Sequence, residues 1–307
     1  MKANLLVMAF LLFAGSRTAF PDDLDSAYEN LKQAESRKDA VQVKKLAAET
    51  CALARQAIST SVPEGVEQEA WNKRIAYARD IELYTEYALY ATAVQGPPAT
   101  TVELLAALEQ QNPKSKFLDQ AYGNYVMALN QLSDAQRAVT LAETALAQFP
   151  DNEDLLLVLC DSALNKKQTD RAQAYSERLI VVLYRHPVPE GMPPADWERK
   201  KSTALGRAHW TAGMMHGDKN QYFEADKDLR TALRLVKGND TMTAAALFYL
   251  GVANYQLGAM SRNRAQILEG ASFSEQAAAI KGPLSPQAWR NAQAMKTEAE
   301  KLRLARR

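Results

Sequence analysis

Apolar residues recur at helical spacing almost from the start of the chain. Leu24, Ala27, Tyr28 and Leu31 stand at i, i+3, i+4 and i+7, on one face of a helix. Similar segments follow, separated by short breaks rich in Pro, Gly, Asn and Asp. The pattern predicts helices over about 22–35, 40–58, 66–94, 100–111, 118–132, 133–149, 155–164, 170–184, 197–216, 222–236, 242–257, 262–280 and 285–304.

A fixed period joins the helices between Asp119 and His186. Small or bulky side chains recur at matching slots thirty-four residues apart, first at Ala138, Ala142, Ala145 and Pro150 and then at Ala172, Ser176, Leu179 and Tyr184. A repeat of this length indicates stacked helical hairpins. The small side chains let neighbouring helix axes approach to roughly 8 Å.

Two helix starts carry the pattern of a capping box, in which a hydroxyl and a carboxyl or amide three residues later satisfy the first backbone N–H groups. Thr100 with Glu103 predicts one box, and Ser133 with Gln136 predicts the second. Gly282-Pro283 breaks the chain before a final helix from Ser285, which we interpret as the cap over the last apolar face.

The stretch Tyr249–Gly258 resembles the first helix of a tetratricopeptide repeat, with Leu250-Gly251 in the Leu-Gly pair of that motif. The preceding second helix is also similar, because Tyr222, Ala225, Leu229 and Ala232 occupy its aromatic, small and bulky slots. The resemblance covers about residues 80–280 in five units, and the hairpin at 24–60 is a candidate sixth. It implies an all-α, right-handed superhelical solenoid of antiparallel helix pairs with a C-terminal capping helix.

The predicted organisation has six parts. They are a signal peptide (1–20), an N-terminal helical hairpin (21–65), repeats (66–186), a proline-rich loop (187–196), further repeats (197–282) and the capping helix (283–307).

The first twenty residues have the pattern of a secretory signal. Lys2 precedes an apolar run from Leu5 to Phe13, and the small residues Ala14, Gly15 and Ser16 follow. The run is shorter than the roughly 20 residues that span a bilayer as a helix. We therefore expect an exported protein, periplasmic or secreted, with an uncleaved membrane anchor as the alternative.

The charge balance argues against a nucleic-acid-binding protein, and the positions of the two cysteines argue against a disulfide. The 37 basic and 36 acidic residues nearly cancel, and no concentrated cationic stretch predicts nucleic-acid binding. Cys51 and Cys160 lie on different predicted helices, 109 residues apart. In an elongated stack that separation favours two buried free thiols over a disulfide.

No catalytic, cofactor or metal motif stands out. The sequence has no G-x-S-x-G, phosphate-binding loop or H-E-x-x-H pattern. His209 and His216 share a helix face near Asp218, but both occupy core-facing slots of the repeat, so we interpret them as packing residues. We predict no catalytic residue, no metal and no cofactor.

In the resembling family the first helices line a concave groove that holds a protein partner. The slots facing it carry Trp210, Met214, Phe248, Val252 and Tyr255, with Tyr87 and Tyr90 from an earlier unit. Exposed aromatic and Met side chains are typical of peptide-binding hot spots. Alternatively, these residues contact the neighbouring helix, or the 187–196 loop folds over them.

Some members clamp a carboxylate with Lys, Arg and Asn. Asn124 and Asn130 are available here, but Gly123, Leu157 and Asp161 occupy the neighbouring slots, which disfavours a clamp and favours apolar contacts. The resemblance thus implies a non-catalytic protein–protein interaction scaffold for a protein or peptide partner. A helical-repeat enzyme or glycan-binding accessory protein is the first alternative, and a structural part of an envelope complex is the second.

Overall fold

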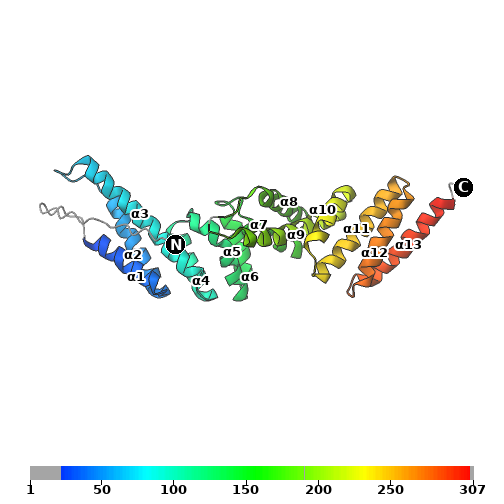
Figure 1. Ribbon diagram of the computed structural model, residues 1–307, viewed down its shortest axis with the longest axis horizontal. Coiled ribbons are helices and arrows are strands. Elements are labelled where there is room, and N and C mark those ends of the chain that lie inside the picture. Colours follow the sequence, from blue (N-terminus) through cyan, green and yellow to red (C-terminus); the bar gives the residue numbers. More distant parts are fainter. Residues whose placement is uncertain (1–21, 190, 305–307) are drawn as a thin grey trace, which may run out of the picture. The chain divides into compact units, whose positions relative to one another are not determined.

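The computed structural model describes residues 22–189 and 191–304, which form thirteen α-helices and no strand (Figure 1). The helices are α1 (Asp22–Ser36), α2 (Ala40–Ser59), α3 (Gln68–Ala93), α4 (Pro98–Gln111), α5 (Lys116–Gln131), α6 (Ala135–Ala145), α7 (Glu153–Asn165), α8 (Thr169–Arg185), α9 (Pro194–Asp218), α10 (Tyr222–Leu235), α11 (Asp240–Met260), α12 (Arg264–Ala279) and α13 (Ser285–Leu304). The all-helical fold predicted from periodicity is confirmed. The predicted signal lies outside the described residues.

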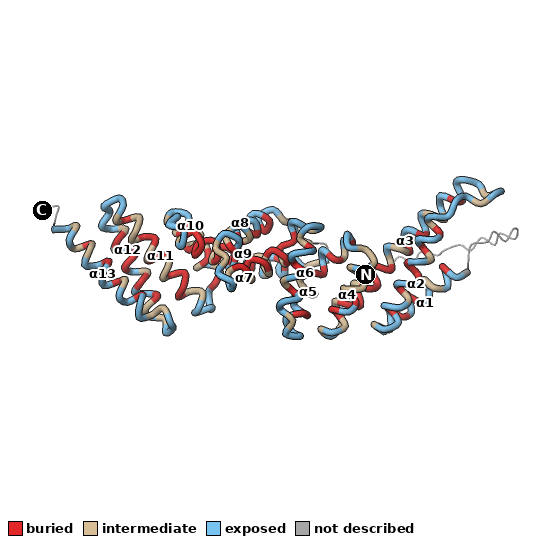
Figure 2. Tube along the Cα trace, turned by 180° about the vertical axis from the view of Figure 1, so that it is seen from behind, coloured by how far each residue is buried: buried red, intermediate tan, exposed pale blue. Residues whose placement is uncertain are grey.

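The helices form two compact units, one ending at Thr92 and the other beginning at Ala93. In the first unit, α1, α2 and α3 share a small core of Leu24, Ala54, Ala57, Ala78 and Ile81. In the second unit each helix from α4 to α13 packs on the next along the chain. Figure 2 shows the buried residues along the sides by which neighbouring helices meet.

The same tight turn joins the two helices of five hairpins. A non-glycine residue with positive φ stands in each turn, at Lys38, Ser133, Lys167, Asn220 and Arg262. The backbone N–H of the residue after it donates to the carbonyl oxygen five residues earlier in the chain. The donors are Asp39, Asp134, Gln168, Gln221 and Asn263. This Schellman-type ending satisfies carbonyls at the end of the first helix before the second begins. The hairpins α1–α2, α5–α6, α7–α8, α9–α10 and α11–α12 are thus structural repeats.

Both predicted capping boxes are wrong. Helix α4 begins at Pro98, and its cap residue Pro97 makes no side-chain hydrogen bond, because the proline ring carries no acceptor. Ser133 has a φ of +60° as the turn residue, so Asp134 caps α6 by accepting from the Arg137 N–H at 3.2 Å.

Other boundaries agree closely with expectation. The last helix runs from Ser285 to Leu304, as predicted. The proline-rich segment is shorter than expected, because Pro194 already forms the first turn of α9. Cys51 and Cys160 are free and buried, as expected. Within the described residues, no helix combines the length and apolar character that crossing a membrane requires.

Small residues bring the helices together where the pattern placed them. Ala138 and Ala172 are 2% and 0% exposed. A close approach lies between α11 and α12, where a Cβ on Gly270 would stand 2.7 Å from the Gly251 carbonyl oxygen and 2.8 Å from the Tyr255 nitrogen. Both are backbone atoms, so neither can move without displacing a helix.

We therefore expect Gly270→Ala to lower the free energy of unfolding by about 1–3 kcal/mol, because overpacking outweighs the better helix propensity of alanine. Urea denaturation would measure the change. Gly282→Ala is the matched control, since a Cβ there meets no atom within 4 Å. Equal stability of the Gly270→Ala variant and the parent would contradict the proposed close approach.

Candidate functional site

The second unit has an inner layer of odd-numbered helices. The backbones of α5 and α7, of α7 and α9, of α9 and α11, and of α11 and α13 approach one another closely, whereas among the described helices no two even-numbered backbones do. The even-numbered helices meet only through long side chains, such as Arg171 with Glu143 and Arg230 with Glu269. Helices whose backbones lie close to their second neighbours are on the inside of a curved stack, and those whose backbones lie farther apart are on the outside. The inner face is therefore built from the first helix of each hairpin.

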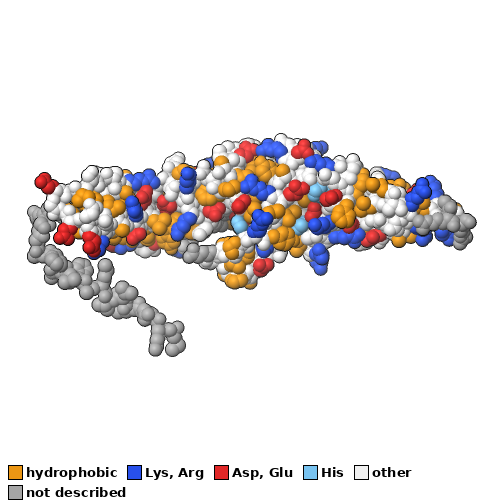
Figure 3. Space-filling model, turned by 90° about the horizontal axis from the view of Figure 1, so that it is seen from above, with side chains coloured by type: hydrophobic (Ala, Val, Ile, Leu, Met, Phe, Trp, Pro, Cys, Tyr) orange, Lys and Arg blue, Asp and Glu red, His pale blue; other side chains and the backbone are white. Residues whose placement is uncertain are grey.

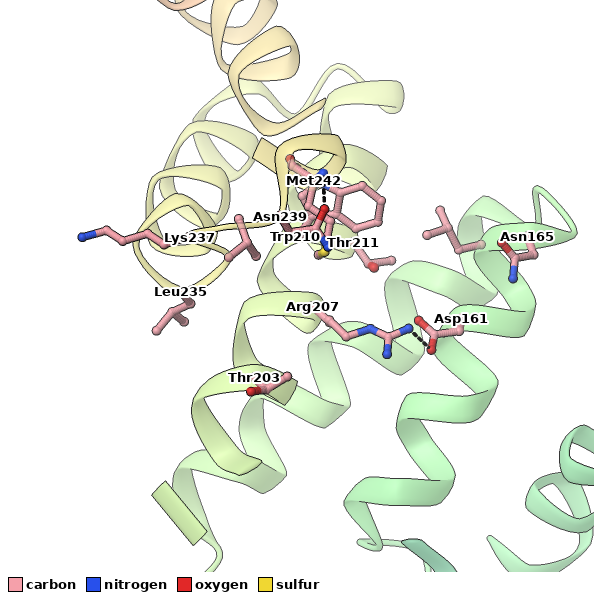
Figure 4. Close-up of a pocket in the computed structure, with 12 residues that line it drawn as sticks. Asp161, Asn165, Thr203, Arg207, Trp210, Thr211, Leu235, Lys237, Asn239 and Met242 are labelled. Carbon is pink, nitrogen blue, oxygen red and sulfur yellow. Dashed lines mark hydrogen bonds and ion pairs between the residues drawn. The ribbon is translucent and has the colours of Figure 1, made fainter. Parts of the chain in front are cut away.

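A hollow of about 600 Å³ opens beside α7 and α9 (Figure 4). The turn between α10 and α11 closes its other side. Its lining combines apolar, amide and charged side chains: Asp161, Leu164, Asn165, Thr203, Arg207, Trp210, Thr211, Leu235, Val236, Lys237, Asn239 and Met242. Gly206 permits this geometry, because a Cβ there would stand 3.0 Å from the Leu235 Cβ.

Trp210 is the largest apolar side chain of the hollow. Its indole N–H donates to the Met242 carbonyl oxygen at 3.0 Å, which ties α9 to the first turn of α11. The ring is half-buried against the core formed around Leu229 and Leu250. The indole is thus held in one orientation while part of it faces the hollow.

One ion pair crosses the hollow between α7 and α9. The Arg207 guanidinium donates to the Asp161 carboxylate (Figure 4). Burial raises the pKa of Asp161 above its ordinary value, and the charge and hydrogen bond of Arg207 oppose that rise. Lys237 on the rim is exposed. Two cations and one carboxylate therefore line the hollow.

A second ion-pair group joins the same two helices one heptad away. Lys200 Nζ lies 2.8 Å from Glu153 Oε1 and 2.7 Å from Asp154 Oδ2. Burial disfavours charge on Glu153, yet Lys200 holds the pKa of this carboxyl below its usual range; burial raises the pKa of Asp154. Gly123 makes room for the group, because a Cβ there would meet Asp154 Oδ2 at 2.7 Å.

The predicted groove residues fall into three places. Trp210 lines the hollow, and Met214, only 7% exposed, belongs to the core beneath it. Phe248 and Tyr255 are half-buried on α11, and each packs against a different hydrophobic cluster that includes residues of α12 and α13. Val252, which lies between them in the sequence, is also half-buried. Tyr87 and Tyr90 lie on α3, with Tyr87 41% exposed.

The two histidines of α9 face a carboxylate of α10. His209 Nδ1 lies 2.8 Å from Asp228 Oδ1, and His216 Nε2 lies 3.4 Å from Asp228 Oδ2. Asp218 instead accepts from the Tyr249 hydroxyl at 3.2 Å. Both imidazoles are 7% exposed, in keeping with their core-facing slots.

The charged members of the hollow were missed by sequence reasoning. Asp161 was placed toward the groove, but its partner Arg207 belongs to the next hairpin, beyond the proline-rich segment. A signal was present in the spacing. Asp154 and Asp161 are seven residues apart on α7, and Lys200 and Arg207 are seven apart on α9, so two aligned pairs follow from two parallel faces.

Stacked hairpins that line an inner face with their first helices define a helical-repeat scaffold. The Tetratricopeptide repeat family model matches residues 129–180, from the end of α5 through most of α8. This segment is therefore similar to the tetratricopeptide repeat, and repeats of that family are generally non-catalytic and bind protein partners. No curated protein matches the chain.

We expect Lys200→Met to lower the free energy of unfolding at pH 7 by about 2–4 kcal/mol, because two largely buried carboxylates lose their ammonium partner. The loss should shrink below about pH 4, where protonation removes the charge that Lys200 neutralises. Urea titrations across this pH range measure both effects.

Lys227→Met removes the same charge from an exposed site on α10 and serves as control. It should change stability by less than about 0.5 kcal/mol. Equal effects of the two substitutions would contradict the role assigned to the buried group.

Proposed function

We propose that this chain is an exported, non-catalytic scaffold that binds an extended segment of a partner protein along the inner face of the second unit. Trp210 anchors the segment in the hollow between α7 and α9. The observation that carries the proposal is the half-buried indole, fixed by its hydrogen bond to Met242 beside an open volume of about 600 Å³. Rigid aromatic anchors of this kind dominate peptide interfaces.

Residues of α11 extend the surface beyond the hollow. Phe248, Val252 and Tyr255 lie on the same inner-layer helix and are each half-buried. A partner segment that leaves the hollow along this helix would bury further apolar area at roughly 25 cal/mol per Å². In this proposal the hollow gives specificity for the partner segment, and the α11 residues enlarge the apolar area that the segment buries.

The proposal of a non-catalytic role is supported by the state of the two thiols. Burial raises the pKa of Cys160 to about 12 and also raises that of Cys51, so both stay protonated at neutral pH. A protonated thiol is a weak nucleophile. Export is supported by the apolar run from Leu5 to Phe13 behind Lys2.

Replacing Trp210, Phe248 and Tyr255 together by alanine should abolish the capture of the partner in a crosslinking experiment with the full chain in its cell. The apolar anchors are then absent while the helices persist. Mass spectrometry of the adducts, beside a thermal melt that verifies folding, measures the effect.

The matched control changes Tyr184 and Phe223 to alanine. These aromatic residues are 59% and 69% exposed on the even-numbered helices α8 and α10. If the triple variant keeps all its adducts, or if the control loses them equally, the inner face is not the binding surface. Recovery of an oligosaccharide in place of a protein would also contradict the proposal.

A further inference from the structure

The turn from α12 to α13 and the start of α13 carry exposed apolar side chains. Pro283 and Pro286 are exposed, and Trp289 is 59% exposed. Pro286 and Trp289 stand three residues apart on α13, so their side chains are neighbours on the helix surface. We term these three residues the end patch, because α13 is the last described helix of the second unit and packs on α11 and α12.

Hydrogen bonds and packing hold the end patch toward solvent. Ser285 Oγ donates to the Ala278 carbonyl oxygen at 2.6 Å, and the Ser285 N–H donates to the Gly282 carbonyl oxygen at 3.2 Å. Ala288, the neighbour of Trp289, is fully buried in a cluster shared with α11 and α12. Because the inward side of α13 is packed in this way, the indole is directed outward.

Trp289 differs from the other three tryptophans of the chain. Trp71 and Trp197 are 5% and 1% exposed, and the Trp210 indole N–H is bonded to Met242. The Trp289 indole N–H has no hydrogen-bond partner among the described residues. An indole combines an apolar ring with a polar N–H, so it is favoured where water meets an apolar phase.

The C-terminal part of the sequence, which contains the end patch, is basic. Residues 281–307 contain seven basic and two acidic residues, whereas residues 1–280 contain 30 and 34. No acidic residue stands between Glu275 and Glu298. The near-neutral chain thus has a positive C-terminal end and a negative remainder, and such asymmetry favours interaction with an anionic surface.

Two cations near the end patch lack a carboxylate partner among the described residues. Lys281 is exposed in the turn, and Arg290 stands on α13, where it donates to the Gln287 side-chain oxygen at 2.6 Å. Lys296, by contrast, pairs with Glu275 of α12. Positive charge without a counter-charge therefore lies toward the start of α13, where the apolar side chains are also exposed.

We propose that the end patch binds the surface of an anionic phospholipid membrane, with the Trp289 indole among the headgroups and with Lys281 and Arg290 beside lipid phosphates. Exposed apolar side chains accompanied by Lys and Arg are typical of segments that lie on a membrane surface. Anionic headgroups attract such cations within about a Debye length. An acidic protein segment would offer the same charge but no apolar phase for the indole. The inference is independent of the hollow beside α7 and α9.

Quenching by brominated lipid tests the contact directly. The full chain is mixed at low salt with vesicles of brominated phosphatidylcholine, either alone or with an equal amount of phosphatidylglycerol, and tryptophan fluorescence is recorded. The mixed vesicles should quench much more strongly than the zwitterionic ones, and added salt should reverse the effect. Trp289→Phe should abolish the quenching, because the bromine atoms reach only this indole. Equal quenching by both kinds of vesicle, or none by either, would overturn the proposal.

Sedimentation with the anionic vesicles measures the contribution of each residue. Lys281→Gln and Arg290→Gln should each weaken partitioning about fivefold, since each removes one cation from the anionic surface. Trp289→Ala should weaken it about tenfold through lost apolar burial. Lys227→Gln and Phe223→Ala are the matched controls, because both residues are exposed on α10, and these changes should have almost no effect.

Three further outcomes would overturn the assignment. An equal loss in the Lys227→Gln and Lys281→Gln variants would indicate only attraction by the net charge. Full vesicle binding by a Trp289→Ala variant whose thermal melt matches the parent would exclude the end patch from the contact. Binding of a polyglutamate peptide that Trp289→Ala weakens would assign the patch to an acidic protein. Trp210→Ala should leave vesicle binding unchanged, so failure here is distinguishable from failure of the proposed groove function.

Discussion

The second unit depends on how closely its helices can approach one another. Many positions that face a neighbouring helix are occupied by Ala, Gly or Ser, and a Cβ on Gly251 would stand only 2.2 Å from the Ser274 hydroxyl. Close contact aligns each hairpin with the next and leaves the odd-numbered helices touching one another. The inner face, and therefore the hollow, follows from this packing.

The charged groups of the inner face reinforce the alignment. Asp154–Lys200 and Asp161–Arg207 join α7 to α9 at two levels. Because each of these carboxylates is already paired with a cation from the same chain, the pairs leave little net charge on the inner face to attract an acidic or basic partner. On the surface seen in Figure 3, acidic and basic side chains are likewise interspersed. Recognition in the hollow then rests on the fixed Trp210 indole and on shape.

Much of the fold could be predicted from the sequence, because periodicity and breakers are local. The final helix was predicted at Ser285–Leu304, and the small-residue period correctly located buried Ala138 and Ala172. Helix starts were less predictable, since Ser133 is a left-handed turn residue and not a cap. That conformation is set by the ending of α5, which single-residue preferences do not reveal.

The candidate site could be predicted only in part. Register placed Trp210 toward the inner face, where it lines the hollow, but Met214 is in the core. The Arg207–Asp161 pair joins residues 46 positions apart, so the matching seven-residue spacings on α7 and α9 indicate it only once the two helices are known to lie side by side. The ring contact between Tyr28 and Tyr84 likewise forms only when α1 packs on α3.

The central claim is that a partner occupies the hollow between α7 and α9. A photoreactive residue is the most direct probe, introduced as Thr203→p-benzoylphenylalanine in the hollow or as Glu224→p-benzoylphenylalanine on the exposed side of α10. The account predicts a protein adduct from position 203 that disappears when Trp210→Ala is added, and none from position 224. An adduct from position 224 and none from position 203 would contradict it.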